Sequence, residues 1–295
     1  MYYKIRDDVL FRKYQGHGYI TDNSEYGYRM LDDIHRYLGE KYVSASGAVM
    51  LSMLSKLPRS IEDIVRELSQ IFIGIEYETL KQDTEEFFDL FVDEGFLSCG
   101  ETIEACTDQF LETVSKFSDC GQIQDGIVTN DCIGGKINPN EFLRSIHIEI
   151  ADACNERCIH CYIPNEHKSH MIDSTLFYRI IEEGRKMNII HVTLSGGEPL
   201  LHKDILGFLK TCRKLELSVN VLSNLTLLTD DIISEMKKNA LLSVQASLYS
   251  MDATVHDSIT KLNGSFEKTK DGILRLCDEG IPVQISCPVI KQNKD

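Results

Sequence analysis

Three cysteines, Cys154, Cys158 and Cys161, lie within eight residues of sequence CNERCIHC. They follow residues 144–150, whose alternating apolar residues predict a β-strand. Thiolates are the ligands that zinc and iron-sulfur clusters prefer, so this spacing predicts a loop that wraps one soft metal centre. Three thiolates are one fewer than a closed site needs. A four-iron cluster held in this way keeps one iron open to another ligand.

A structural zinc site is the main alternative for these three thiols. His160, His167 or His170 would supply the fourth ligand, and three cysteines with one histidine form a common zinc donor set. Zinc would not account for a second motif further along the chain, nor for the repeated strand and helix pattern around it.

The second motif is Ser195–Pro199, with the sequence SGGEP, directly after the predicted strand 189–194. A glycine pair by itself predicts only a tight turn, and a phosphate-binding loop is a further alternative. The absent side chains of Gly196 and Gly197 let a ligand approach the backbone closely. The glutamate and proline that follow favour a positively charged ammonium group as that ligand over a phosphate.

The two motifs in this order resemble the radical S-adenosylmethionine (SAM) superfamily. The resemblance implies a [4Fe-4S] cluster ligated by the three cysteines, with SAM chelating the open iron. It also implies that Gly196, Gly197, Glu198 and Pro199 contact the amino group of SAM. Transfer of one electron then splits SAM into methionine and a 5′-deoxyadenosyl radical that abstracts a hydrogen atom. The cofactor supplies this chemistry and the protein positions it.

Three further positions are expected from the resemblance to contact SAM. His160 precedes the last cysteine, where the family has an aromatic ring against the adenine. Asn224 and Ser247 end two predicted strands, where family members hold the SAM ribose and carboxylate. Asn224 and Ser247 are also explained as polar turn or capping residues, and the alternative for His160 is a ring that faces solvent. Tyr249, near the same edge, is a weaker candidate, and we assign no catalytic residue.

From residue 141 to 295 predicted strands alternate with predicted helices. The strands are residues 146–150, 189–194, 218–222, 242–248 and 283–289. Helices are expected to begin near Asp173, Asp204, Thr229 and Ser265, which are residue types that cap helices. Residues 250–264 are expected to form a loop. Repeated βα units predict an α/β fold with a parallel sheet, here a partial barrel of the radical SAM type, with both motifs at one edge.

Residues 1–98 are predicted to form a small, winged-helix-like α+β domain. Strand-like segments at residues 9–14, 19–21 and 28–31 precede helical patterns at 49–57, 61–68 and 80–91. The arrangement resembles the peptide chaperone of pyrroloquinoline quinone biosynthesis, a recognition domain found fused to peptide-modifying radical SAM enzymes. The resemblance implies that a leader peptide adds a strand to this domain and rests on a helix. A capping domain with a purely structural role is the alternative.

Residues 99–140 are predicted to be a linker because their second half is rich in Gly, Asn and Asp. Four cysteines lie there at irregular spacings, and we expect free thiols, with an additional metal site as the alternative. They are Cys99, Cys106, Cys120 and Cys132.

The net charge of −15 argues against a nucleic-acid or anionic-membrane surface. Residues 1–98 alone hold 11 basic and 18 acidic residues, so a DNA-binding winged helix is not expected. There is no apolar run of membrane-spanning length and no signal-peptide pattern, which makes the cytoplasm the expected location. Ten cysteines then fit a reducing compartment.

The expected function is maturation of a ribosomally synthesised peptide by radical chemistry that forms a crosslink, with a flavodoxin or ferredoxin as electron donor. Related enzymes complete six βα units and continue into a cysteine-rich SPASM domain with auxiliary clusters. Only five strands are predicted here, so we expect a chain that is incomplete at its C-terminus. The alternatives are another radical SAM enzyme of protein or cofactor maturation, or a non-catalytic peptide-binding protein.

Overall fold

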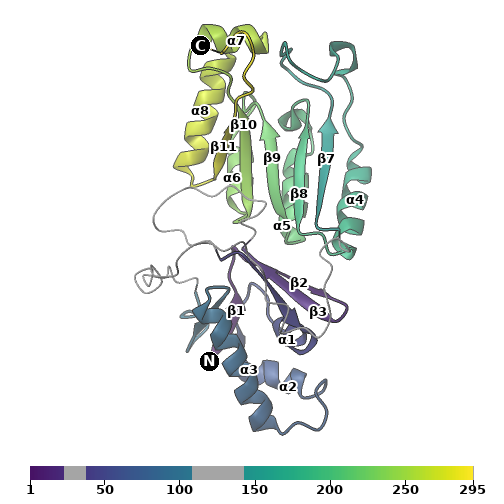
Figure 1. The fold of residues 1–295 in the computed structure, drawn as a ribbon, viewed down its shortest axis with the longest axis vertical. Helices are drawn as coiled ribbons and strands as arrows, with labels where there is room; N and C mark the ends of the chain where they lie inside the picture. Colours follow the sequence, from purple (N-terminus) through teal and green to yellow (C-terminus); the bar gives the residue numbers. More distant parts are fainter. Residues whose placement is uncertain (23–37, 108–142, 295) are drawn as a thin grey trace. The chain divides into compact units, whose positions relative to one another are not determined.

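The computed structural model describes residues 1–22, 38–107 and 143–294 (Figure 1). These residues fall into two compact units. The first contains residues 1–22 and 38–107, and the second contains residues 143–294. Among the described residues, no helix has both the length and the apolar character that a membrane span requires.

The second unit is built on a five-stranded parallel sheet in the order β11-β10-β9-β8-β7 (Figure 1). The strands are β7 (Ser145–Ala151), β8 (His191–Gly196), β9 (Ser218–Ser223), β10 (Leu242–Ser247) and β11 (Val283–Ser286). Helices α4 (Ser174–Lys186), α5 (Ile205–Lys214), α6 (Asp230–Lys237) and α8 (Ser265–Asp278) lie between successive strands in the chain. The predicted α/β fold with a partial barrel is confirmed.

The two faces of this sheet differ in chemistry because successive side chains of a strand point to opposite faces. One face packs against the helices through apolar side chains that are almost fully buried, among them Val192, Leu194, Val219, Val221 and Val244. The alternate positions are polar and include His147, Thr193, Asn220, Ser243 and Gln245. The sheet therefore joins the helical core on one side and presents hydrogen-bonding groups on the other.

Two of the four helix starts are capped by the residues that the sequence indicated, whereas Asp204 makes no capping hydrogen bond and the N-cap of α8 is Gly264, the residue before Ser265. Asp173 accepts a hydrogen bond from the Leu176 amide at 3.1 Å, and Thr229 accepts one from the Ile232 amide at 3.4 Å. Each side chain satisfies an amide that has no partner within its helix. The strand and helix boundaries of this unit thus agree closely with those predicted.

One helix of this unit was not predicted. Helix α7 (Ala253–Thr260) lies within residues 250–264, which were expected to form a loop. Asp252 caps it by accepting from the amides of Thr254 and Val255. The Asp257 carboxylate accepts from the Gly264 amide at 2.6 Å and so supports the entry to α8.

The first unit contains two antiparallel three-stranded sheets, ordered β5-β1-β6 and β2-β3-β4. Their strands are β1 (Tyr2–Ile5), β2 (Leu10–Tyr14), β3 (His17–Thr21), β4 (Glu40–Ser44), β5 (Arg59–Ser60) and β6 (Leu97–Gly100). Helices α1 (Ala45–Leu51), α2 (Ile61–Leu68) and α3 (Tyr77–Asp93) enclose a core that includes Leu51, Ile61, Phe88 and Phe91. This is the small α+β unit that was predicted.

The helices of the first unit match the predicted pattern in part. Ser60 caps α2 by accepting from the Asp63 amide at 3.1 Å, as predicted. Helix α1 is shorter and begins earlier than predicted, because Ser44 caps it through the Gly47 amide. Strands β1, β4, β5 and β6 were not predicted, and the strand predicted at residues 28–31 lies outside the described residues.

The predicted linker begins too early in the sequence. Residues 99–107 continue the first unit: β6 extends to Gly100, and the Cys106 thiol is buried and donates to the Ser98 carbonyl at 3.4 Å. A Cβ atom on Gly100 would lie 2.4 Å from the Cys106 amide nitrogen, so the turn depends on glycine. Cys120 and Cys132 lie outside the described residues.

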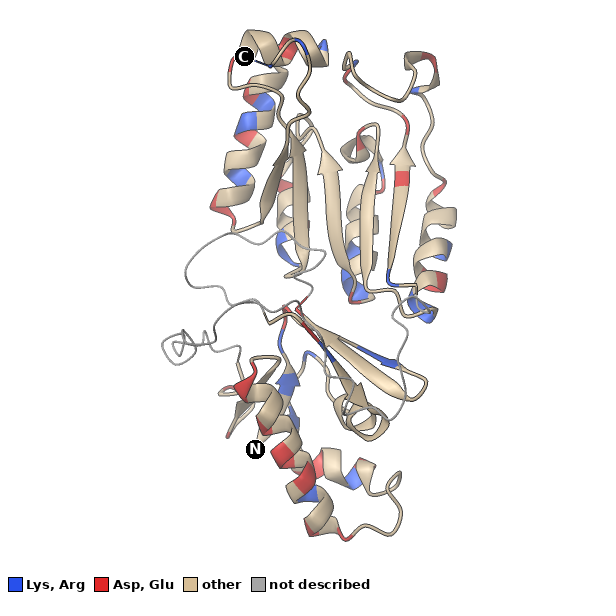
Figure 2. Ribbon diagram, viewed as in Figure 1, with Lys and Arg blue, Asp and Glu red and all other residues tan. Residues whose placement is uncertain are grey.

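Charge in the first unit is concentrated on α3, where Figure 2 shows acidic side chains along the helix. The helix carries six acidic residues and a single lysine. A phosphate backbone would be repelled from such a surface, which supports the expectation that this unit does not bind nucleic acid.

Candidate cofactor site

The two motifs lie against each other at the carboxyl ends of β7 and β8. Ala151 of β7 is in register with Gly196 of β8. Past the strands, the Glu198 amide donates to the Ala153 carbonyl at 2.9 Å. The SGGEP segment therefore contacts the start of the loop that carries the three cysteines, residues 152–173, which we call the cysteine loop. Adjacent parallel strands end at the same edge of a sheet, and this geometry brings together motifs about 40 residues apart in the sequence.

Glycine is required at the second and third positions of SGGEP. Gly196 has φ of +124°, and a Cβ atom there would lie 1.9 Å from the Ala151 carbonyl oxygen. A Cβ atom on Gly197 would lie 2.4 Å from the Ala153 carbonyl oxygen. The obstacles are backbone atoms, which cannot move aside as a side chain would. The glycines therefore allow close contact between two backbone segments.

The three cysteines of the loop are free thiols with partly exposed side chains. The Glu156 amide donates to the Cys154 sulfur at 3.3 Å. Burial raises the pKa of Cys154, and burial together with the Glu156 charge raises the pKa of Cys158 to about 12. Cys154 and Cys158 therefore stay protonated until a cation replaces the proton, because metal ligation requires the thiolate.

The cysteine loop is fastened to the end of α7 by its backbone. The Arg157 amide donates to the Thr260 carbonyl at 2.9 Å, and the Ile159 amide donates to the Ile259 carbonyl at 3.0 Å. The loop is thus held on one side by SGGEP and on the other by the α7 helix that the sequence did not reveal.

The donor set fits an iron-sulfur cluster better than zinc. The predicted zinc alternative needs a histidine beside the thiols, but the His170 ring lies 3.1 Å from the Asp152 carboxylate, and His160 packs edge-on against Tyr249. Within the described residues no three His, Cys, Asp or Glu side chains surround a single point. A cluster places each thiolate on its own iron, so its ligands need not converge on one point.

Glu198 is fully buried and ties the SGGEP segment to the end of β9. Its carboxylate accepts from the Ser223 hydroxyl at 2.8 Å, the Leu200 amide at 2.9 Å and the Asn224 amide at 2.8 Å. Burial raises the pKa of Glu198 to about 7. The carboxylate was expected to contact SAM. Its side chain is instead enclosed by protein donors, and Pro199 behind it begins a short 3-10 turn, Pro199–Leu201.

Replacing Glu198 with glutamine is expected to change how stability depends on pH. A carboxyl whose pKa rises from 4.5 to about 7 on folding binds its proton more tightly in the native state. Stability is therefore expected to fall as pH rises through this window, by about 3 kcal/mol in all. Glutamine does not ionise, so the variant should lack this loss. Urea unfolding of both proteins from pH 4.5 to 8 measures the difference, and parallel stability curves would contradict the prediction.

The other predicted SAM contacts lie around the same edge. Asn224 follows β9, and its side chain donates to the Asn155 side-chain oxygen at 3.0 Å within the cysteine loop. Ser247 ends β10 and is half-buried. His160 lies in the loop itself, and its ring is 4.8 Å from the Tyr249 ring, measured between centroids. The structure thus places the predicted positions on adjacent strand ends, with Asn224 already engaged by the loop.

Sequence reasoning missed two buried polar residues of the cysteine loop, Glu156 and Lys168. They are 2% and 7% exposed. The Glu156 carboxylate accepts from the Ser265 hydroxyl at the start of α8 and lies 3.4 Å from the Cys158 sulfur. Loop residues have no periodic pattern that would indicate burial. The only sequence signal for these two residues was that they lie near the cysteines in the chain.

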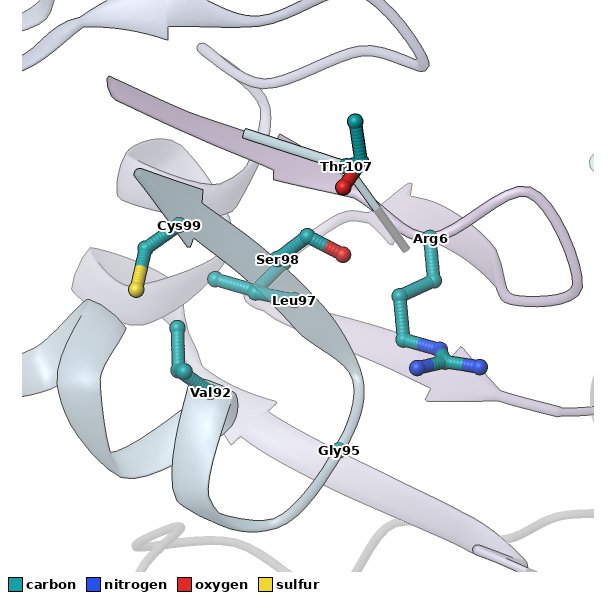
Figure 3. A pocket seen from close by; sticks show the side chains of 7 residues that line it. All are labelled: Arg6, Val92, Gly95, Leu97, Ser98, Cys99 and Thr107. Atoms are coloured by element: carbon teal, nitrogen blue, oxygen red, sulfur yellow. The ribbon is translucent and has the colours of Figure 1, made fainter. Parts of the chain in front are cut away.

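A small pocket in the first unit is lined by residues of α3 and β6 and their surroundings (Figure 3). Its volume is about 40 Å³, enough for a few water molecules, each of which needs about 10–15 Å³ measured in this way. It is too small for a nucleotide or a peptide side chain of ordinary size, and we assign it no ligand.

Residues 148–295 match the family model of the radical SAM superfamily, and residues 32–97 match that of coenzyme PQQ synthesis protein D (PqqD). Among curated relatives, the GTP 3′,8-cyclase of Petrotoga mobilis is 29% identical over 51% of this chain and 48% of its own length. The PqqA peptide cyclase of Methylocella silvestris is 24% identical over 50% of this chain and 40% of its own length. The subtilosin biosynthesis protein AlbA of Bacillus subtilis is 29% identical over 52% of this chain and 35% of its own length. The chain spans less than half the length of each.

A solved structure with the same fold is that of Streptococcus suis SuiB bound to its precursor peptide SuiA. It has a TM-score of 0.54 and 13% identity, covering 97% of this chain and 56% of SuiB. At this identity the likeness supports the fold. The superfamily model covers half of the sequence and includes both motifs of the site, and this protein therefore belongs to the radical SAM superfamily.

Proposed function

We propose that this protein is a radical SAM maturase of a ribosomally synthesised peptide. The observation that carries the proposal is the combination of a radical SAM unit with a PqqD-like unit in one chain. Enzymes with radical SAM units act on many substrates. A second unit of a peptide-binding family favours a peptide over a small molecule.

The superfamily uses a [4Fe-4S] cluster and SAM. When bound here, they would supply a 5′-deoxyadenosyl radical that removes a hydrogen atom from the peptide, the step that leads to a crosslink. Cys154, Cys158 and Cys161 would hold the cluster. The half-buried backbone of Gly196 and Gly197 would face the SAM amino group.

The remaining predicted residues have supporting roles in this proposal. Glu198 would position the glycine segment through its contacts with Ser223 and Asn224, because its carboxylate is enclosed by those donors. His160, with Tyr249 beside it, offers a ring for the adenine. Ser247 offers a hydroxyl at the neighbouring strand end. No residue of this chain is assigned a proton-transfer role.

The first unit would bind the leader peptide of the precursor. Among the described strands of the sheet β2-β3-β4, the outer ones are β2 and β4. Strand addition at one of them, with the peptide resting on a helix, is a known way to capture extended peptides. A flavodoxin or ferredoxin would supply electrons, as expected from the superfamily.

A second candidate is a radical SAM enzyme that acts on a nucleotide or another small molecule. The likeness to the GTP 3′,8-cyclase of Petrotoga mobilis favours it, because that identity is as high as the identity to AlbA. The likeness to the cyclase covers only about half of this chain, however, and does not account for the PqqD-like unit.

The test is an anaerobic assay of the full chain after reconstitution with iron and sulfide. SAM, a chemical reductant and a displayed library of random peptides are supplied, and bound peptides are selected and sequenced. We expect deoxyadenosine to form from SAM. Selected peptides should increase protection from hydrogen exchange in β2 or β4. Deoxyadenosine without any selected peptide would favour the small-molecule candidate, and protection confined to the second unit would contradict leader binding by the first.

A further inference from the structure

Lys168 is a buried lysine in an otherwise exposed segment of the cysteine loop. Its side chain is 7% exposed, whereas the residues on both sides of it, from Pro164 to His167 and at Ser169 and His170, are exposed. An ammonium group loses its hydration when it is buried, at a cost that is offset only by partners or by a nearby anion. A buried lysine in this position therefore indicates that polar partners or an anion lie close to its ammonium group.

The partners present satisfy only part of this ammonium group. Its Nζ donates to the Glu156 carbonyl oxygen at 3.2 Å. Among the described residues, no carboxylate lies within ion-pair distance of it, since the Glu156 carboxylate itself is directed to the Ser265 hydroxyl and the Cys158 sulfur. An ammonium group has three donors, so part of its hydrogen-bonding capacity remains for another anion, and its charge also acts on the Glu156 carboxylate.

The nearest candidates for that anion are the sulfurs of the loop. The residue whose carbonyl receives the Lys168 bond, Glu156, also donates its amide to the Cys154 sulfur at 3.3 Å. Lys168 and Cys154 therefore bond to the carbonyl oxygen and the amide of the same residue, and Cys154 must be a thiolate to bind iron.

We propose that Lys168 is the internal counter-cation of the cysteine loop. It positions the Cys154–Glu156 turn through the Glu156 carbonyl, and its charge stabilises the negative charge that three cluster thiolates bring to the partly buried cysteines of the loop. The inference rests on the proposed [4Fe-4S] cluster. Adding an electron to the cluster adds negative charge, so a buried cation beside it makes reduction easier.

Arg157 provides an internal comparison. Its guanidinium also donates to the Glu156 carbonyl, at 2.8 Å, but the residue is exposed. Water and salt screen an exposed charge far more than a buried one. The electrostatic role is therefore assigned to Lys168, although the two side chains share an acceptor.

The test compares Lys168→Met, which removes the charge at similar length, with Lys168→Arg, which keeps it. Lys210→Met is the matched control, because Lys210 is exposed on α5 and loses the same charge. Each full chain is reconstituted, its iron content and circular dichroism are measured, and the cluster is titrated with reductant under electron paramagnetic resonance. We expect Lys168→Met to lower the midpoint potential by the equivalent of about tenfold in the reduction equilibrium, ~59 mV for one electron.

The midpoint potential of Lys168→Arg should stay close to that of the unmodified protein, and the potential of Lys210→Met should equal it. Loss of iron from Lys168→Met alone, with Lys168→Arg intact, would also support the role of the charge. An unchanged potential in a fully loaded Lys168→Met protein would overturn the inference, as would equal shifts in the methionine and arginine variants. Failure of the unmodified chain to take up iron would instead count against the proposed function.

Discussion

Replacing Cys154, Cys158 and Cys161 together with alanine is expected to abolish iron uptake and all deoxyadenosine formation from SAM. The three cysteines are the only thiols in the loop between β7 and α4. Alanine has no group that binds iron, so no other ligand set near SGGEP can replace them. Iron and sulfide analysis after anaerobic reconstitution gives the first readout, and deoxyadenosine measured by chromatography gives the second.

The matched control removes three thiols that lie elsewhere. Cys99, Cys277 and Cys287 are free and at least partly exposed, so their replacement by alanine should leave iron content and deoxyadenosine formation close to normal. The loss of exposed side chains is expected to change stability by no more than ~0.5 kcal/mol for each. Iron retained by the loop variant, or zinc found in place of iron in the unmodified chain, would contradict the cluster assignment.

Much of the second unit could be predicted because its signals are local. In strands such as Val219–Val221, buried apolar residues alternate with polar ones, and two of the helices between the strands start at side chains that bond their own first-turn amides, those of Asp173 and Thr229. The parallel sheet then followed from the repeated βα units. The fold and the meeting of the two motifs were therefore accessible from the sequence.

Helix α7 could not be predicted for a physical reason. Its buried residues are His256, Ile259 and Thr260, so its inner face is partly polar and gives no apolar stripe. The His256 ring accepts from the Tyr249 amide at 3.2 Å, a contact that depends on the turn after β10. This helix holds the cysteine loop, so the sequence located the thiols without revealing their support.

The directions of polar side chains at the site were equally inaccessible. Glu198 was expected to contact SAM, yet its oxygens meet Ser223 and two amides, because β9 ends beside it. Asn224 likewise bonds Asn155, a residue 69 positions earlier. Such contacts depend on tertiary packing, and the sequence motif identifies only the residues that take part in them.

Gly197→Ala is expected to weaken SAM binding at least roughly tenfold and to destabilise the second unit by about 1–3 kcal/mol. The new Cβ atom would lie 2.4 Å from the Ala153 carbonyl oxygen and 2.5 Å from that of Asp152. Both obstacles are backbone atoms, so the SGGEP segment must move away from the cysteine loop. That movement would break the bond from the Glu198 amide to Ala153, which is 2.9 Å long. Cluster and ligand would then be held by two segments that no longer fit together.

Gly207→Ala separates this steric effect from the general effect of adding a methyl group. Gly207 lies in α5, and its Cβ atom would meet the Tyr178 hydroxyl at 2.5 Å, the far end of a side chain that can turn aside. Alanine favours a helix over glycine by up to ~1 kcal/mol, which offsets that adjustment. SAM affinity, measured by equilibrium dialysis on reconstituted protein with iron content matched, should therefore be unchanged in Gly207→Ala and reduced in Gly197→Ala. Equal affinities in the two variants would show that the close contact between the motifs does not shape the SAM site.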